Sequence, residues 1–263
     1  MSALDDLVSL VATLRGPAGC PWDRAQTPAT MRPYLLEEAY EVVEAIDGGE
    51  PDALQAELGD LLFQIVLIAQ MAQEAGRFSI QDVALGIHHK MVRRHPHVFV
   101  PGHVEADAGS VSAWEARKAM ERPAGSSALD GVPNALPALI RAHRVGEKAA
   151  RVGFDWPDAG GVREKVDEEL GELDAALAGG DPAEIVDEYG DALLALANLG
   201  RALGLSPEDA LRGASAKFEG RFRLMEALAE ARGAPLQTLD AEALDALWRE
   251  AKALSAATPN KGA

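Results

Sequence analysis

Five carboxylates share one short stretch of the chain and raise the question of what offsets their charge. The stretch EELGELDAALAGGDPAEIVDEYGD covers residues 168–191 and is typical of two short helices separated by a GGDP turn. Two unit charges about 4 Å apart repel by roughly 4 kcal/mol at an effective dielectric constant of about 20. Either these groups point apart into water, or a cation lies between them. The acids are Glu168, Glu169, Glu172, Glu188 and Asp191.

The same pattern of acids occurs a second time, 131 residues earlier and without a gap. The earlier copy, LLEEAYEVVEAIDGGEPDALQAELGDLL, covers residues 35–62 and carries Glu37, Glu38, Glu41, Glu57 and Asp60. Further along each half, a Lys/Arg pair and a Trp/Lys pair follow in the same order. These are Lys90, Arg94, Trp114 and Lys118 in the first half and Lys217, Arg221, Trp248 and Lys252 in the second. We interpret the chain as a tandem duplication of about 120 residues.

Helical geometry brings the acids of one copy together. At 100° per residue, Glu168, Glu169 and Glu172 span about 100° of arc on one side of a helix. Glu188 and Asp191 are i,i+3 neighbours on the next helix, and the short turn predicts that the two helices are antiparallel. The carboxylates can then converge on one groove. A site of oxygen ligands alone suits Mg²⁺ or Mn²⁺ and does not suit zinc.

The acids have two other possible interpretations, a solvated helix face and a di-iron site. A single EExxE pattern in an acidic helical protein is usually a solvated face, but two copies, each followed by ExxD after a turn, argue against that. A di-iron bundle would need ExxH on two helices, and no histidine stands near either cluster in the sequence. The repeat therefore favours a site for a hard divalent metal.

The basic and aromatic residues leave alternatives open. Lys217 and Arg221 lie one helical turn apart and can contact phosphate oxygens, or they can pair with neighbouring acids. Trp114 and Trp248 can stack on a base, although a tryptophan at a helix end more often packs. The histidines in IHHKMVRRHPHVF lack cysteine partners and zinc-site spacing, so we interpret them as structural or electrostatic.

Composition limits the classes of function. The 263 residues are 48% hydrophobic with a net charge of −17, which disfavours polymeric nucleic acid and anionic membranes as partners. Cys20 is the only cysteine, the start MSALDD does not resemble a signal peptide, and no apolar run approaches roughly 20 residues, so we expect a soluble cytoplasmic protein. The helical periodicity predicts an all-α fold. The Gly/Ser/Pro-rich segment near 122–137 predicts an N-terminal domain over 1–122, a linker over 123–136 and a C-terminal domain over 137–263.

Several of these motifs together resemble a known family. EEAYE followed by ELGD, the RRHPHVF segment, GCPWD, and EELGE followed by DEYGD are similar to the MazG family of nucleoside triphosphate pyrophosphohydrolases in its full-length, two-copy form. The resemblance implies two tandem helical domains of four-helix-bundle character, a homodimer and a Mg²⁺ cofactor that Mn²⁺ can replace. It also implies hydrolysis of a (d)NTP at the α-phosphorus to (d)NMP and pyrophosphate.

The resemblance implies roles for individual residues. Glu168 would orient water or support the ligands. The metal ligands would be Glu169, Glu172, Glu188 and Asp191, matched in the first half by Glu38, Glu41, Glu57 and Asp60. The nucleotide contacts would be Lys217, Arg221, Trp248 and Lys252.

The two halves are predicted to be unequal. Asn198 lies two turns beyond Asp191 and can offer a donor and an acceptor to a base or sugar, whereas its counterpart Leu67 offers neither. We therefore expect the C-terminal domain to be the main catalytic site. A catalytically weak protein that senses metal-nucleotide or binds a partner, and a purely structural helical dimer, are the alternative functions. The sequence does not indicate the preferred base or sugar, or whether damaged nucleotides or ppGpp are targets.

Overall fold

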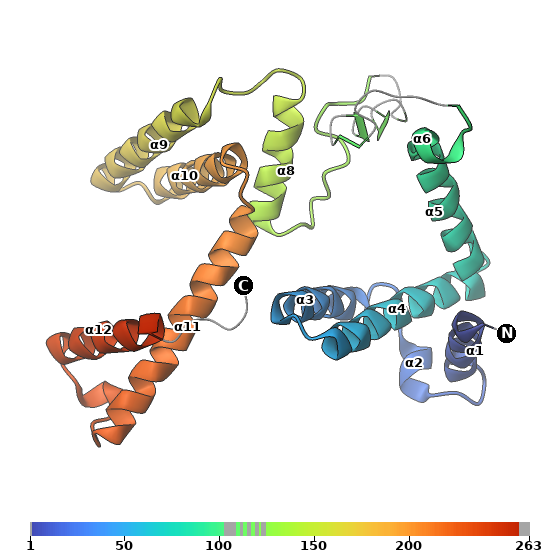
Figure 1. The fold of residues 1–263 in the computed structure, drawn as a ribbon, viewed down its shortest axis with the longest axis horizontal. Coiled ribbons are helices and arrows are strands. Elements are labelled where there is room, and N and C mark those ends of the chain that lie inside the picture. Colours follow the sequence, from blue (N-terminus) through green and yellow to red (C-terminus); the bar gives the residue numbers. More distant parts are fainter. Residues whose placement is uncertain are drawn as a thin grey trace. The chain divides into compact units, whose positions relative to one another are not determined.

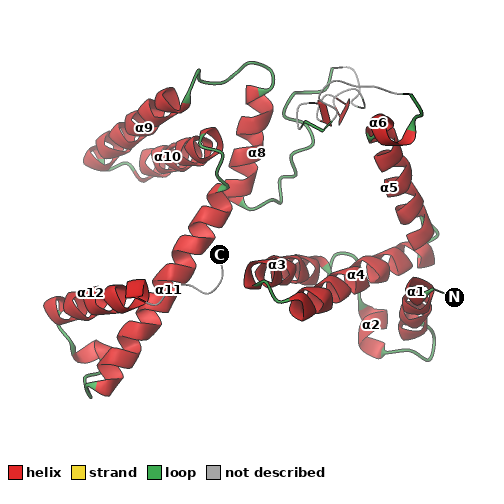
Figure 2. Ribbon diagram, viewed as in Figure 1, coloured by secondary structure: helices red, strands yellow, loops and turns green. Residues whose placement is uncertain are grey.

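The computed structural model of the chain describes residues 2–102, 109–110, 113–114, 117–118, 121 and 125–257. Every regular element in this part of the chain is helical, which confirms the predicted all-α fold class (Figure 2). The chain divides into two compact units, which we call unit 1 (residues 1–122) and unit 2 (residues 123–259). Each unit is described by itself.

Unit 1 is built around an antiparallel pair, α3 and α4 (Figure 1). Helix α1 packs on α4 and on α2, and α5 follows α4 after a short turn. The helices are α1 (Ala3–Arg15), α2 (Pro21–Ala25), α3 (Arg32–Gly48), α4 (Pro51–Glu74), α5 (Ile80–Arg94) and α6 (Pro96–Phe99).

Unit 2 repeats this plan with α9 and α10 as the antiparallel pair and α8 packed on α10 (Figure 1). The long α11 follows, and α12 packs back along it. The elements are α8 (Ala138–Ala150), α9 (Ala159–Gly179), α10 (Pro182–Ala202), α11 (Pro207–Ala231), the 3-10 helix η1 (Leu236–Thr238) and α12 (Ala241–Ala257).

The same turn chemistry reverses the chain in both pairs. Gly49 and Gly180 end α3 and α9 in the left-handed conformation, with φ of 73° and 78°. Glycine adopts that conformation without the steric cost of a Cβ. Pro51 and Pro182 then begin α4 and α10 at the first helical position, where a missing N–H costs nothing. These turns set the spacing of the acids that flank them.

The core of unit 1 lies between α1, the start of α3 and the second half of α4. It consists of Val11, Met31, Val66, Leu67 and Met71. The Arg15 guanidinium closes one end, because it pairs with Glu74 at 2.7 Å and donates to the Asp23 carbonyl at 2.5 Å. In unit 2 a separate core joins α11 to α12 and consists of Met225, Ala229, Leu247 and Ala251.

Helix α4 is both long and apolar. An 18-residue window of it has a mean hydropathy of 1.3, so by length and composition alone it could cross a membrane, which corrects the expectation that no apolar run reaches that length. A single such helix is weak evidence, because the core helix of a soluble protein passes the same test. Val66 and Leu67 of this helix are buried in the unit 1 core, which accounts for part of its apolar character.

Candidate active site

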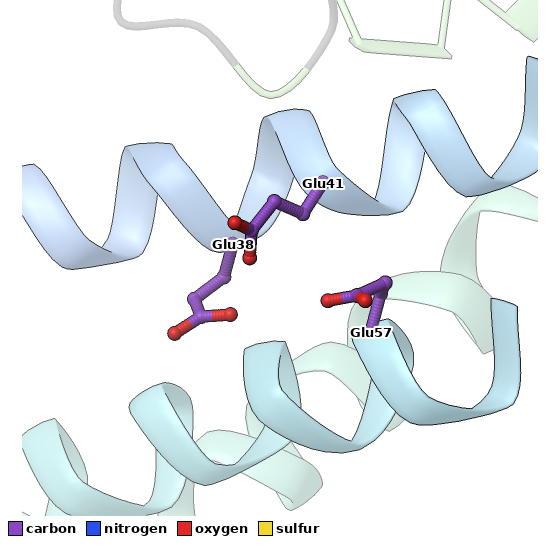
Figure 3. Close-up of side chains that lie close together, drawn as sticks. All are labelled: Glu38, Glu41 and Glu57. Carbon is purple, nitrogen blue, oxygen red and sulfur yellow. The ribbon is translucent and has the colours of Figure 1, made fainter. Parts of the chain in front are cut away.

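Three glutamates gather in each unit. Glu169 and Glu172 of α9 meet Glu188 of α10, and each offers an oxygen that lies within 4.8 Å of the others. In unit 1 the same arrangement is formed by Glu38, Glu41 and Glu57, whose carboxylates point toward one another between α3 and α4 (Figure 3). Three of the four predicted ligands are therefore brought together in each unit.

The aspartates lie outside these groups of three. Asp60 and Asp191 follow Glu57 and Glu188 by three residues, and neither has an oxygen within the 4.8 Å set. Asp191 is nevertheless close enough for its charge to raise the pKa of Glu188. It also lines a cavity beside the group.

The glutamate groups concentrate negative charge. Loss of hydration, followed by the charges of Glu172 and Asp191, holds the pKa of Glu188 above its ordinary value. The pKa of Glu41 is raised in the same way, first by loss of hydration and then by Glu57 and Glu38. Repulsion between neighbouring carboxylates is a strain that a divalent cation would relieve.

A lysine that the sequence analysis missed offsets part of this charge in unit 2. Lys165 Nζ donates to Glu168 at 2.7 Å and to Glu169 at 2.8 Å, and these contacts raise the lysine pKa. The signal was present in the sequence, since Lys165 precedes the two acids by three and four residues. Glu168 therefore contacts the lysine, and it is not a member of the group of three.

The other oxygen of Glu169 has no protein partner. Glu169 is only 6% exposed, and among the described residues its buried Oε2 receives no hydrogen bond. An unpaired carboxylate oxygen is costly to bury, so it needs a ligand that the protein does not supply. The all-oxygen donor set and this oxygen fit Mg²⁺ or Mn²⁺.

The matching glutamate of unit 1 has a different partner. Glu38 accepts a hydrogen bond from the buried Gln64 at 3.1 Å. The counterpart of Lys165 is Tyr34, whose ring makes an edge-to-face contact with Trp22. In the described part of unit 1, no ion pair joins a cation to the three glutamates. The two sites therefore have the same arrangement of three glutamates, but Lys165, the cation beside the site of unit 2, has no counterpart in unit 1.

A cavity of about 190 Å³ lies next to the glutamate group of unit 2. Lys165, Glu169 and Asp191 form one part of its wall. Small and apolar residues of α8 and α10 form another part, and Asn198 and Arg201 contribute polar atoms. The predicted substrate contact Asn198 is therefore beside the carboxylates.

The other four predicted substrate contacts lie elsewhere in unit 2. Lys217 and Arg221 are on α11, while Trp248 and Lys252 are on α12. In the described part of unit 2, no hydrogen bond, ion pair or ring contact joins them to the glutamates. Trp248 packs on Phe218, with ring centroids 5.2 Å apart, and borders the α11–α12 core, which supports the packing alternative.

The two predicted substrate contacts on α11 differ from Arg212 and Arg223 of the same helix, which pair with acidic residues of α11. Neither Lys217 nor Arg221 forms an ion pair among the described residues, and Arg221 Nε is buried without a hydrogen-bond partner. This argues against the alternative that they serve only in pairs on the helix surface. An unpaired buried guanidinium nitrogen indicates a place for an anion.

Comparison with known proteins connects this geometry to a family. The profile of the MazG nucleotide pyrophosphohydrolase domain matches residues 26–99, and that of phosphoribosyl-ATP pyrophosphohydrolase matches residues 148–217. The two matches include the glutamate groups of units 1 and 2, respectively.

Relatives match over nearly the whole chain. The nucleoside triphosphate pyrophosphohydrolase of Escherichia coli (strain K12) is 46% identical, covering 96% of this chain and 98% of the relative. The nucleoside triphosphate pyrophosphohydrolase/pyrophosphatase MazG of Thermotoga maritima is 47% identical, covering 94% and 95%. The uncharacterized protein YabN of Bacillus subtilis is 44% identical over 93% of this chain and 50% of its own length. The chain therefore belongs to the MazG family of nucleotide pyrophosphohydrolases.

Proposed function

We propose that the protein is a Mg²⁺-dependent nucleoside triphosphate pyrophosphohydrolase that cleaves an NTP or dNTP at the α-phosphorus, giving the monophosphate and pyrophosphate. The observation that carries the proposal is the glutamate group of unit 2, with the unpartnered Oε2 of Glu169 beside a cavity. The family membership and the names of the relatives from Escherichia coli and Thermotoga maritima support the same activity.

Different residues of unit 2 would bind the metal and contact the phosphate oxygens. Glu169, Glu172 and Glu188 would hold the metal, with Asp191 at the edge of the group. A bound divalent metal supplies neutralisation of polyphosphate charge and a lower pKa for an attacking water. The chain itself contributes Lys165, whose ammonium is held against the glutamates by Glu168 and can donate to a phosphate oxygen. Glu168 is thus proposed as a residue that positions Lys165.

We propose unit 2 as the main catalytic site. Where unit 2 has Asn198 beside a cavity, unit 1 has Leu67, which is 0% exposed in the packed core of that unit. Unit 1 also lacks a counterpart of Lys165. We propose that its glutamates Glu38, Glu41 and Glu57, with Asp60 nearby, bind metal with little turnover. We propose these glutamates of unit 1 as the site at which the alternative function, metal-nucleotide sensing, would reside.

We further propose that the protein is a cytoplasmic homodimer. Large apolar side chains of α9 and α10 stay exposed in the single chain, among them Leu177, Val186 and Leu196. An exposed apolar surface on a helix pair is typical of a face that packs against other helices. Lys217, Arg221 and Lys252 form no hydrogen bond or ion pair with the glutamates of their own chain among the described residues, and we propose that a second copy brings them to the site. A solution mass equal to that of one 27.8 kDa chain would contradict the dimer.

Pyrophosphate release from a mixture of NTPs and dNTPs tests the activity. We expect release with Mg²⁺, loss of release on chelation with EDTA, and recovery when Mg²⁺ or Mn²⁺ is added in excess. Glu172→Gln should be inactive, and circular dichroism should show that it is folded. Full-rate release in EDTA would refute the metal dependence. Absence of release, together with thermal stabilisation by metal and nucleotide, would favour the sensing function.

A further inference from the structure

We propose that Arg201 and Asp155 are positioning residues that fix the amide of Asn198, so that its Nδ2 donor, rather than its oxygen, is the group turned toward a ligand in the cavity of unit 2. The consequence is a preference for bases that carry a carbonyl group over bases that carry an amino group at the same position. The inference rests on the proposed function, because it takes the cavity as the place of the nucleobase.

The orientation of the Asn198 amide follows from its neighbour. Arg201 Nε lies 2.6 Å from the side-chain oxygen Oδ1 of Asn198. An arginine Nε–H can only donate, so the Asn198 atom that faces it must be the oxygen. The amide oxygen thereby accepts one hydrogen bond from within the chain.

The amide nitrogen is then the group left for a ligand. Asn198 is nine-tenths buried and lines the cavity, and no acceptor among the described residues takes a hydrogen bond from its Nδ2. Gly146 of α8 makes room for this arrangement, since a Cβ there would lie 2.8 Å from Asn198 Oδ1. The Nδ2 donor therefore faces the cavity without a protein acceptor among the described residues, and a ligand in the cavity can accept from it.

Arg201 is itself held in place. Its guanidinium donates through both terminal nitrogens to the two carboxylate oxygens of Asp155, with Nη1 lying 3.0 Å from Oδ2. Asp155 belongs to the segment between α8 and α9, 46 residues away in the sequence. A two-bonded guanidinium–carboxylate pair fixes both position and rotation, so the Nε–H cannot swing away from Asn198.

The size and lining of the cavity suit one ring system. Its volume of about 190 Å³ is below the roughly 300–1,000 Å³ of pockets that enclose a whole drug-sized ligand. Ala142, Val145 and Leu194 supply apolar contacts, and the 77% exposed Phe154 offers a ring face for stacking. Glu169 and Asp191 line the same cavity, so a nucleotide whose phosphates lie at the carboxylates would place its base here.

One donor at Asn198 discriminates between carbonyl and amino groups. A carbonyl oxygen accepts from Nδ2, whereas an exocyclic amino group would set donor against donor. UTP and CTP differ in this way at position 4 of the base, and ITP and ATP differ at position 6. We expect kcat/KM to be higher for the carbonyl member of each pair by roughly 3- to 10-fold, the factor that one neutral hydrogen bond gives.

The test is the kcat/KM ratio within each pair, measured on the full chain. Asn198→Asp should invert the ratio, because its second oxygen presents an acceptor to the cavity. Arg201→Gln, which installs the residue found at the matching position of unit 1, and Asp155→Asn should bring the ratio toward one. Phe154→Ala should weaken the binding of all four nucleotides and leave the kcat/KM ratio within each pair unchanged. Arg232→Gln is the matched control, because Arg232 also forms a two-bonded pair, with Glu250 on α12, away from the cavity.

The outcomes separate this inference from the proposed function. A wild-type ratio near one, or a ratio unchanged in both Asn198→Asp and Arg201→Gln while pyrophosphate is still released, overturns the inference alone. If no nucleotide is hydrolysed, the proposed function fails, and calorimetric binding of IMP, AMP, UMP and CMP then decides the inference. Tighter binding of IMP than AMP and of UMP than CMP, lost in Arg201→Gln, would uphold it. Equal binding within both pairs would overturn it.

Discussion

Truncation of Leu67 to alanine should destabilise unit 1 strongly and leave catalysis in place. Leu67 is 0% exposed and lies among the buried side chains of Val11, Met31, Val66 and Met71. Leucine-to-alanine changes at fully buried positions cost about 2.7–5 kcal/mol, because the lost burial and the remaining cavity add together. The complete burial here places the expected loss at about 3–5 kcal/mol.

The expected loss in the free energy of unfolding corresponds to a drop in melting temperature, whose size depends on the number of residues in unit 1. Unfolding entropy of about 2.1 cal/mol/K per residue gives about 0.26 kcal/mol/K for the 122 residues of unit 1. A loss of 3 kcal/mol therefore lowers Tm by about 12 °C. Leu10→Ala is the matched control, because half of the Leu10 side chain is already exposed on α1 and its removal should cost about 1 kcal/mol or less.

Calorimetric melting and pyrophosphate release, measured on the same preparations, check both parts of the expectation. Leu67→Ala should lower the transition of unit 1, and at temperatures below that transition it should retain kcat/KM within about twofold of wild type. An unchanged transition would refute the packing of α1 on α4 around Leu67. A folded Leu67→Ala protein without activity would refute the assignment of catalysis to unit 2.

Three further outcomes are expected. Glu172→Gln should lower kcat/KM by at least about 100-fold, since even the loss of a residue that only hydrogen-bonds to a metal ligand costs about 10- to 100-fold. Glu41→Gln should lower it by less than about threefold, and equal losses would show that both sites turn over or are coupled. Without metal, Glu172→Gln should melt at a higher temperature than wild type, because a like charge is removed from the group; a lower melting temperature would contradict this. Hydrogen bonding to Arg201 lowers the pKa of Asp155, so its contribution to stability is present above the unfolded pKa of about 3.9 and is lost as the pH falls through the lower folded value. Asp155→Asn should flatten that part of the acid unfolding curve, and an unchanged curve would refute the pairing.

The sequence predicted features that depend on local geometry. The turn signals GGEP and GGDP correspond to left-handed glycines followed by prolines at the first helical position. Ser206 directly precedes Pro207, which begins α11, and its side chain accepts from the Asp209 backbone N–H in the same local way. Helical spacing placed Glu169 and Glu172 on one side of α9 opposite Glu188, because i,i+3 neighbours share a face whatever surrounds them.

The features that the sequence did not predict depend on tertiary contacts. Asp155 and Arg201 are 46 residues apart, and no periodicity relates a residue of the α8–α9 segment to one of α10. Arg201 and Asn198 are i,i+3 neighbours on α10, so spacing allows their hydrogen bond, but the pairing with Asp155 that holds the Arg201 guanidinium in place is tertiary. Gln64 is a similar case, since its hydrogen bond to Glu38 crosses from α4 to α3. Their partners are set by packing, which local patterns do not encode.

The contrast between the units explains how a duplicated fold can acquire two roles. Both units keep the turn, the helix pair and three converging glutamates, so the features on which the proposed metal binding rests are common to the two. Leu67 extends the packed core in unit 1, whereas Asn198 lies beside a cavity in unit 2, with Gly146 leaving room for its amide. A filled position favours stability, and an open polar one offers a ligand a hydrogen-bond donor. We therefore propose that the residues around the glutamates, more than the glutamates themselves, decide which unit receives a base.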